Sequence, residues 1–289
     1  MSIREYLEKK HRPSTVKIYL FEIDHYIKAL GEEKAQAATY SQVSDYLAYL
    51  RKKYDNAGTI KRILHAVKQY YHYLIEIEAR TTHPCRYMSI RDSKKEIQIQ
   101  DLLSEKELDA LLKQRKERYP LLKLRNQALM SLLIYQALLP GDIARLTVKD
   151  IDLEKATIHV QGTRKTDERT LSLHSSQIML FYKYLHEVRP RLMERAQPTQ
   201  ALMLTKRGSP EKTDGIHYLV STYRERVPNK KLTPRIIRQS VIASWLKQGK
   251  DLRVVQVFAG HKKPSATEKY RQNNLEALKQ AVDKYHPLR

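Results

Sequence analysis

Cysteine, glycine and acidic side chains are scarce in this 289-residue chain, and each shortage excludes a class of site. The single cysteine, Cys85, can form no intramolecular disulfide and no cysteine-based zinc cluster. The eight glycines make no glycine-rich loop of the kind that cradles a nucleotide phosphate. We therefore expect a reducing compartment and a function that uses no bound nucleotide.

The shortage of acidic residues leaves a large excess of positive charge. Lys and Arg number 54 against 32 Asp and Glu, so the net charge is +22, and no low-complexity basic tail carries it. Such an excess is typical of a protein that binds a polyanion, and double-stranded DNA is the common one. RNA, an acidic lipid or a merely solvated basic surface are the alternatives that composition leaves open.

Long apolar runs are missing as well. No stretch approaches the roughly 18 apolar residues that a membrane-spanning helix needs. The first residues, MSIREYLEK, lack the apolar centre of a signal peptide. We therefore expect no membrane partner and a cytoplasmic, nucleoid-associated protein.

Residues 1–84 are predicted to form a helical domain. Apolar side chains recur with the 3.6-residue period of amphipathic helices over about 14–30, 41–53 and 58–77. The polar, charged stretch that follows breaks this period and predicts an interdomain linker over residues 85–101.

The third of these helices carries cations on the face opposite its apolar stripe. They are Lys61, Arg62, His65 and Lys68. Such a face is either simply solvated or in contact with DNA phosphates.

Residues 102–289 are predicted to form a second domain of mixed structure, so the fold class is mainly α with a small β-hairpin (α+β). The alternating segments 155–162 and 168–173 flank a polar turn and predict the hairpin. Helices are expected at about 105–116, 121–136, 141–146, 175–195, 214–226, 233–248, 251–260 and 274–284.

A set of residues suited to phosphate chemistry lies near the end of the chain. Arg235 and Arg238 precede a Gly-His pair at His261, and Tyr270 follows. A tyrosine hydroxyl, with a pKa of about 10, is a weak nucleophile. An arginine fork that holds phosphate oxygens and a histidine that exchanges a proton near neutral pH remedy this weakness. The set suits attack of Tyr270 on a DNA phosphodiester, which gives a covalent 3′-phosphotyrosyl intermediate.

The same segments resemble a known family. The segments 232–239 (LTPRIIRQ), 249–261 (GKDLRVVQVFAGH) and 266–270 (ATEKY) are similar to the C-terminal signature of the tyrosine recombinases, or phage integrases. In family terms that signature is His-x-x-Arg, Leu-Gly-His and Thr-x-x-Tyr. The resemblance runs from about residue 14 to 285. It implies a helical core-binding domain, followed by a catalytic domain with a C-terminal helix, that together clamp DNA.

The resemblance also implies a role for each residue. Arg238 would hold the non-bridging oxygens of the scissile phosphate, and His261 would donate to the phosphate or help deprotonate Tyr270. Arg235 stands where the family has histidine, so it could only donate and neutralise charge. The family's hairpin lysine, which protonates the leaving 5′-oxygen, would be Lys165, because its neighbour Arg164 cannot realistically give up a proton. The alternative is that both hairpin cations only touch DNA phosphates.

One position departs from the family pattern. The family's first arginine lies in a segment like Gly-Leu-Arg-x-x-Glu-Leu, and the matching residues 137–143 (ALLPGDI) place Leu139 there. Loss of a charged donor from a phosphoryl-transfer site can cost several kcal/mol of barrier. Either Arg235 supplies the missing charge, or Arg145 reaches in, or the protein is a weak or inactive relative that still binds DNA.

The resemblance implies a site-specific recombinase that works as a homotetramer on two DNA sites. No metal and no cofactor are expected, because the phosphotyrosine itself stores the bond energy. A non-catalytic DNA-binding or architectural protein and a type IB topoisomerase are the alternatives. After Tyr270, apolar residues with helical spacing could dock on a neighbouring subunit or pack on their own domain. They are Leu275, Leu278, Ala281, Val282 and Tyr285.

Overall fold

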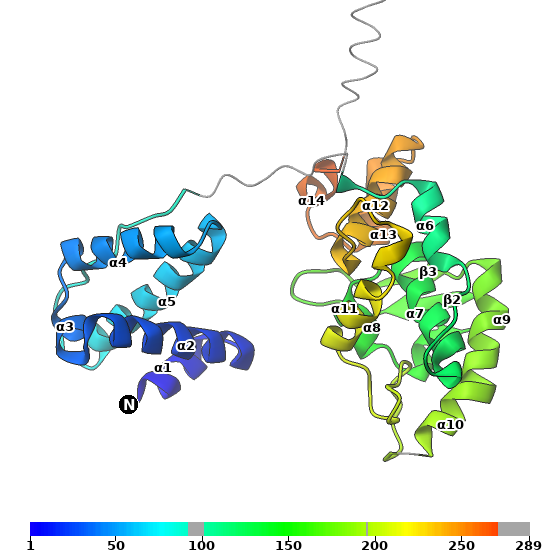
Figure 1. Ribbon diagram of the computed structural model, residues 1–289, viewed down its shortest axis with the longest axis horizontal. Coiled ribbons are helices and arrows are strands. Elements are labelled where there is room, and N and C mark those ends of the chain that lie inside the picture. Colours follow the sequence, from blue (N-terminus) through cyan, green and yellow to red (C-terminus); the bar gives the residue numbers. More distant parts are fainter. Residues whose placement is uncertain (92–100, 195, 271–289) are drawn as a thin grey trace, which may run out of the picture. The chain divides into compact units, whose positions relative to one another are not determined.

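The computed structural model describes residues 1–91, 101–194 and 196–270, and the chain forms two compact units (Figure 1). The units are Met1–Lys95 and Glu96–Arg289, and each has its own hydrophobic core. Within the described ranges, no helix is long and apolar enough to cross a membrane. The predicted helix at 274–284 and its five apolar residues lie outside the described residues.

Helices are the regular elements of the described part of the first unit. They are α1 (Ile3–Lys10), α2 (Pro13–Leu30), α3 (Glu32–Ala37), α4 (Tyr40–Lys53) and α5 (Ala57–Glu76). Helices α2 and α5 pack against each other, as do α4 and α5. The apolar periodicity predicted α2, α4 and α5 but not α1 and α3, because these two helices are too short to show a clear period. A capping box between Ser2 and Glu5 starts α1.

Tyrosines fill much of the first core. The Tyr26 and Tyr71 hydroxyls lie 2.6 Å apart, and Tyr71 donates a hydrogen bond of 2.8 Å to the Ala35 carbonyl. Burial raises the pKa of Tyr26 to about 12, so this phenol stays neutral at physiological pH. These side chains therefore stabilise the fold rather than supply a nucleophile.

The start of the predicted linker belongs to this core. Cys85, Met88 and Ile90 are buried in it, although the linker was expected to begin at residue 85. Lys68 fastens the segment, because its Nζ donates to the Arg86 carbonyl at 2.9 Å and to the Met88 carbonyl at 2.7 Å. The segment is not helical, so its few apolar residues showed no period in the sequence.

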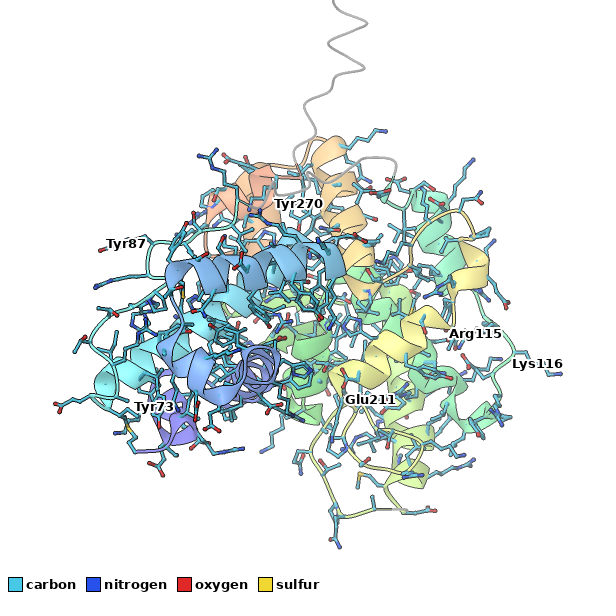
Figure 2. The ribbon with its side chains drawn as sticks, turned by 60° about the vertical axis from the view of Figure 1, so that its left-hand side comes forward. Tyr73, Tyr87, Arg115, Lys116, Glu211 and Tyr270 are labelled. Atoms are coloured by element: carbon cyan, nitrogen blue, oxygen red, sulfur yellow. The ribbon has the colours of Figure 1, made fainter. Side chains whose placement is uncertain are left out.

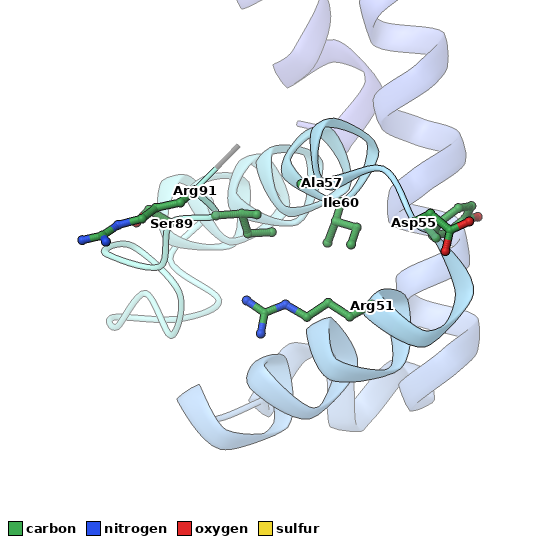
Figure 3. Close-up of a pocket in the computed structure, with 8 residues that line it drawn as sticks. Arg51, Asp55, Ala57, Ile60, Ser89 and Arg91 are labelled. Carbon is green, nitrogen blue, oxygen red and sulfur yellow. The ribbon is translucent and has the colours of Figure 1, made fainter. Parts of the chain in front are cut away.

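A hollow of about 590 Å³ opens between the end of α4, the start of α5 and residues 89–91 (Figure 3). Arg51 and Arg91 line it together with Asp55, and Ile60 and Ile90 add apolar surface. None of its lining residues belongs to the predicted catalytic set.

The second unit surrounds a buried helix, α7. Its α-helices are α6 (Glu105–Leu112), α7 (Lys123–Tyr135), α8 (Pro140–Arg145), α9 (Ser175–Lys183), α10 (Arg189–Met193), α11 (Thr213–Ser221), α12 (Pro234–Lys247), α13 (Leu252–Ala259) and α14 (Pro264–Glu268). Its strands are β1 (Ile151–Asp152), β2 (Thr157–Val160) and β3 (Arg169–Ser172). The short 3₁₀ helices are η2 (Pro120–Leu122), η3 (Val148–Asp150) and η5 (Arg224–Arg226), and η4 (Tyr184–Val188) is a π-helical turn. Leu129, Leu132 and Leu133 of α7 are fully buried, and α7 contacts α6, α9 and α12.

The β structure is a three-stranded antiparallel sheet in the order β1-β2-β3. Strands β2 and β3 form the predicted hairpin, with Ile158 opposite Leu171 and Val160 opposite Arg169. Strand β1 has only two residues and was not predicted from the sequence. The mainly helical fold with a small sheet confirms the predicted fold class.

Candidate functional site

Arg238 lies at the centre of the candidate site. It is on the second turn of α12, which begins with Thr233 as N-cap and Pro234 in its first turn. The residue is 5% exposed. Its Nη1 donates to the Ala137 carbonyl, and its Nη2 donates to the Ala259 carbonyl at 2.6 Å and to His261 Nε2 at 3.1 Å. The guanidinium therefore joins α12 to the loop before α8 and to the end of α13.

Burial lowers the pKa of Arg238 to about 10, and the nearby Arg169 adds to the effect. The group still carries its charge at neutral pH. Three of its five N–H donors are in use, so two remain for an incoming anion.

His261 is held by the turn that ends α13. Gly260 adopts a left-handed conformation with φ of +66°, which is the usual way to end a helix. The His261 ring bonds on both sides, with Nε2 facing Arg238 and Nδ1 2.9 Å from the Thr267 hydroxyl. Because a guanidinium only donates, Nε2 accepts and Nδ1 carries the proton.

The surroundings keep His261 neutral. Burial, Arg238 and Arg169, in that order, lower its pKa to about 4. At neutral pH this histidine is therefore a proton acceptor rather than an imidazolium donor.

Tyr270 lies beside His261 in the same chain. It follows α14, and its backbone N–H donates to the Thr267 carbonyl at 2.9 Å. Its ring packs on the small apolar cluster of Ile242, Val255 and Ala259. The ring is nearly parallel to that of His261, with centroids 6.1 Å apart. Figure 2 shows Tyr270 at the orange end of the second unit, the part that α12, α13 and α14 form in Figure 1.

The hairpin turn lies against the Gly-His turn. Thr166 and His261 form an isolated antiparallel bridge, and Asp167 N–H donates to the Gly260 carbonyl at 3.0 Å. Arg164 and Lys165 are exposed at the tip of this turn. The structure therefore brings the hairpin tip to the same region as Arg238, His261 and Tyr270.

The residues around Leu139 border the same site. Leu139 is the half-buried N-cap residue of α8, and the carbonyl of Ala137, two residues earlier, accepts from Arg238. Arg145 forms an ion pair of 2.7 Å with Asp142, so its guanidinium is already engaged. Arg235 is exposed on the first turn of α12 and makes no hydrogen bond or ion pair with the described residues.

Two further residues lie in the site: Asp142, which stands at the glutamate position of the segment that contains Leu139, and Arg169, to which no motif points. Arg169 of β3 is buried and forms an ion pair with the equally buried Asp142, with Nη2 to Oδ2 at 3.4 Å. A sequence signal did exist, because Arg169 lies two residues before the apolar Leu171 and therefore shares the inward face of the strand with it. An arginine at an inward position indicates a buried partner.

The cations of α5 have different surroundings. Lys61, Arg62 and His65 are exposed, and Arg62 forms an ion pair of 2.7 Å with the buried Glu22. The pKa of His65 is lowered, mainly by burial. Lys68 is occupied by the two carbonyls of the following segment. Lys61 is thus the exposed cation of this set that forms no ion pair or hydrogen bond with the described residues.

Metal-binding groups do not gather anywhere in the described part of the chain: no three His, Cys, Asp or Glu side chains lie close enough to hold an ion. Two carboxylates lie at spacings that metal ligands often have, Asp150 two residues before Asp152 and Glu22 three residues before His25, and both have other partners. Asp150 accepts from the backbone of Thr147, and Glu22, three residues before His25, pairs with Arg62.

Two family models match the chain. The phage integrase family matches residues 101–277, and the phage integrase N-terminal SAM-like domain matches residues 4–77. The chain is 30% identical to a tyrosine recombinase XerC of Pelotomaculum thermopropionicum, over 97% of this chain and 94% of the relative. It is 25% identical to a tyrosine recombinase XerD of Oceanobacillus iheyensis, over 97% of this chain and 95% of the relative.

Solved structures share the fold at lower identity. A XerH site-specific recombinase bound to a palindromic difH substrate, in a post-cleavage complex, aligns with a TM-score of 0.70 at 16% identity, over 97% of this chain and 94% of that one. A lambda integrase dimer bound to a core site aligns with a TM-score of 0.67 at 15% identity, over 95% and 96% of the two chains. The matched family models and the near full-length relatives show that this chain belongs to the phage integrase family of tyrosine recombinases.

Proposed function

We propose that this protein is a site-specific DNA recombinase that cleaves and rejoins DNA through Tyr270. The observation that carries the proposal is the meeting of Arg238, His261 and Tyr270 in one place, from three elements of one chain. The family to which the chain belongs, and its Xer relatives, support this function.

The reaction requires a nucleophile, charge stabilisation and a proton for the leaving group. Tyr270 Oη attacks the scissile phosphorus while the bond to the 5′-oxygen breaks, which leaves a 3′-phosphotyrosyl ester and a free 5′-hydroxyl. The tyrosine proton departs during the attack, and in this proposal it passes to Nε2 of His261, the unprotonated ring nitrogen, which accepts from Arg238 before DNA is bound. Arg238 stabilises the negative charge that grows on the phosphate. Lys165 delivers the proton to the 5′-oxygen, and rejoining reverses each step.

In this proposal, Tyr270 attacks the phosphate that Arg238 of the same subunit holds. Tyr270 packs on Ile242, Val255 and Ala259 of the chain that also supplies Arg238. A lambda integrase tetramer bound to a Holliday junction shares the fold, with a TM-score of 0.69 at 14% identity over 94% of this chain and 75% of that one. We propose that four copies of this chain likewise assemble on two DNA duplexes. Localisation with the nucleoid would follow from DNA binding.

DNA binding should weaken steeply with salt, because a chain of net charge +22 that grips a duplex must release many counterions. Between about 50 mM and about 200 mM salt, we expect affinity to fall by roughly a thousand-fold if six or more phosphates are contacted. Fluorescence anisotropy with a labelled duplex across a salt series measures this. A flat response would exclude the proposed DNA clamp.

Arg235 is expected to replace the charge missing at Leu139. The exposed Arg235 lies one turn before Arg238 on α12 and is not engaged by any described residue. Arg235→His restores the family's usual residue, yet it should slow cleavage at least ten-fold, since imidazole is shorter and only partly charged. Leu139→Arg combined with Arg235→His should recover part of the loss. Cleavage by Arg235→His at the wild-type rate would refute compensation.

The alternative function is DNA binding without catalysis, and Leu139 is the observation that favours it. A nicked suicide duplex separates the two functions. Cleavage releases a short strand that bears the free 5′-hydroxyl, and once this strand diffuses away the covalent complex cannot rejoin. Duplexes would be chosen by selecting bound sequences from random DNA. A complex that survives denaturation on a gel supports the recombinase. Tight binding with no such complex supports the alternative.

A further inference from the structure

The guanidinium of Arg169 lies where the hairpin, α8 and the His261 turn meet. Strand β3 contacts α13, and the Arg169 side chain is 2% exposed. Its Nε donates to the Phe258 carbonyl at 2.9 Å, and its Nη1 donates to the Asp167 carbonyl at 3.2 Å. Its Nη2 pairs with Asp142. One side chain thus links the last turn of α13, the hairpin turn and α8.

The contact with the Gly-His turn is close. A Cβ placed on Gly260 would lie 2.6 Å from Nη1 of Arg169 and 3.0 Å from the Asp167 carbonyl oxygen. Glycine is therefore required at residue 260 for two reasons, the left-handed backbone and the guanidinium packed against its Cα. The turn that carries His261 rests directly on Arg169.

Buried positive charge exceeds buried negative charge around Arg169. Arg169 and Arg238 are both buried, and Arg169 is close enough to lower the pKa of Arg238. Asp142 is the carboxylate that faces them, and it is shared with Arg145. Burying two guanidiniums that repel each other costs free energy of folding. The hydrogen bonds of Arg169 and its ion pair with Asp142 offset this cost and fix the guanidinium in one position.

We infer that Arg169 is a positioning residue that holds the Gly260–His261 turn so that His261 faces Arg238 and Tyr270. This inference goes beyond the family's sequence motifs and rests on the proposed function only for its effect on cleavage. Because the Arg169 side chain is buried, its proposed role requires no contact with DNA. Arg169 acts through the Phe258 carbonyl, the Gly260 contact and its charge.

The chain offers a matched control in Arg125. This arginine is also buried in the second unit, its Nε donates to the Leu204 carbonyl at 2.9 Å, and it pairs with the buried Glu211. Figure 2 shows Glu211 well away from Tyr270. Arg125→Gln therefore removes the same kind of buried ion pair without touching the His261 turn.

The first measurement is cleavage of the nicked suicide duplex by the full-length protein under single-turnover conditions. Relative to the folded fraction, Arg169→Gln should cleave at least ten-fold more slowly than wild type, with DNA affinity unchanged within about three-fold. Arg125→Gln should cleave within two-fold of wild type, although both variants melt at lower temperature. The lysine variants Arg169→Lys and Arg125→Lys repeat the comparison if a glutamine variant fails to fold.

The second measurement needs no activity. The charged or titratable groups around His261 are Arg238 of α12, Arg169 of β3, Tyr270 after α14, and the pair of Asp167 and Lys262. Arg169 is among the groups that lower the His261 pKa to about 4. Its loss should raise that pKa, so the His261 ring should begin to protonate at higher pH in Arg169→Gln. Histidine ring signals in NMR report this, assigned with His261→Asn.

The two measurements separate the possible results. A His261 pKa raised by at least half a unit in Arg169→Gln, but not in Arg125→Gln, supports the positioning role. An unchanged His261 titration, or equal cleavage by the two glutamine variants, overturns it. If wild type itself forms no covalent complex, the proposed function fails, and the titration still decides whether Arg169 acts on His261.

Discussion

Tyr270→Phe is expected to abolish covalent attachment to DNA completely. The change removes one oxygen atom and leaves a ring that can still pack on Ile242, Val255 and Ala259 beside His261. The fold should therefore be preserved while the nucleophile is lost. The measurement is the yield of protein–DNA complex that survives denaturation after incubation with the nicked suicide duplex.

Affinity for the same duplex supplies the control for this variant. Binding is spread over many cations, so the dissociation constant of Tyr270→Phe should stay within a few-fold of wild type. A second control is Tyr218→Phe, because Tyr218 is a highly exposed tyrosine of α11 outside the site. It should cleave like wild type. A covalent adduct in the Tyr270→Phe variant would mean that another tyrosine attacks.

Arg238→Lys is expected to reduce cleavage by about two to three orders of magnitude. Lysine keeps a charge but loses the planar fork that spans the Ala137 carbonyl, the Ala259 carbonyl and His261 Nε2. Lysine therefore cannot make the same set of hydrogen bonds within the site, and it cannot bind two phosphate oxygens through a planar fork. Loss of buried hydrogen bonds should also destabilise the fold by about 1–3 kcal/mol. Rates must thus be compared below the melting temperature of the variant.

Mixing this variant with Tyr270→Phe tests which subunit supplies the nucleophile. If Tyr270 serves the Arg238 of its own chain, each mixed assembly contains only defective sites, and cleavage stays at the level of Arg238→Lys alone. If Tyr270 reaches into a neighbour, some mixed sites combine an intact arginine with an intact tyrosine. Recovery of cleavage in the mixture would then rule out the proposed arrangement within one subunit.

The amino-acid sequence by itself determined the family, the fold class and the catalytic candidates. These properties depend on order and spacing along the chain. Arg238, the Gly-His pair and Tyr270 form a pattern that few chains reproduce, and a 3.6-residue period marks long helices such as α5. Short elements such as α3 and β1 carry too few residues to show a period, so they were found only in the structure.

Tertiary structure alone decided which polar groups meet, because partners far apart in sequence leave no mark on spacing. It assigned Lys68 to two carbonyls and Arg62 to Glu22, although a helix pattern gave all the cations of α5 one face. It also set the protonation of His261, since burial and two guanidiniums drawn from α12 and β3 lower its pKa. Arg169 became part of the site for the same physical reason: folding brings it beneath a turn some ninety residues later in the chain, where its charge and its donors act together.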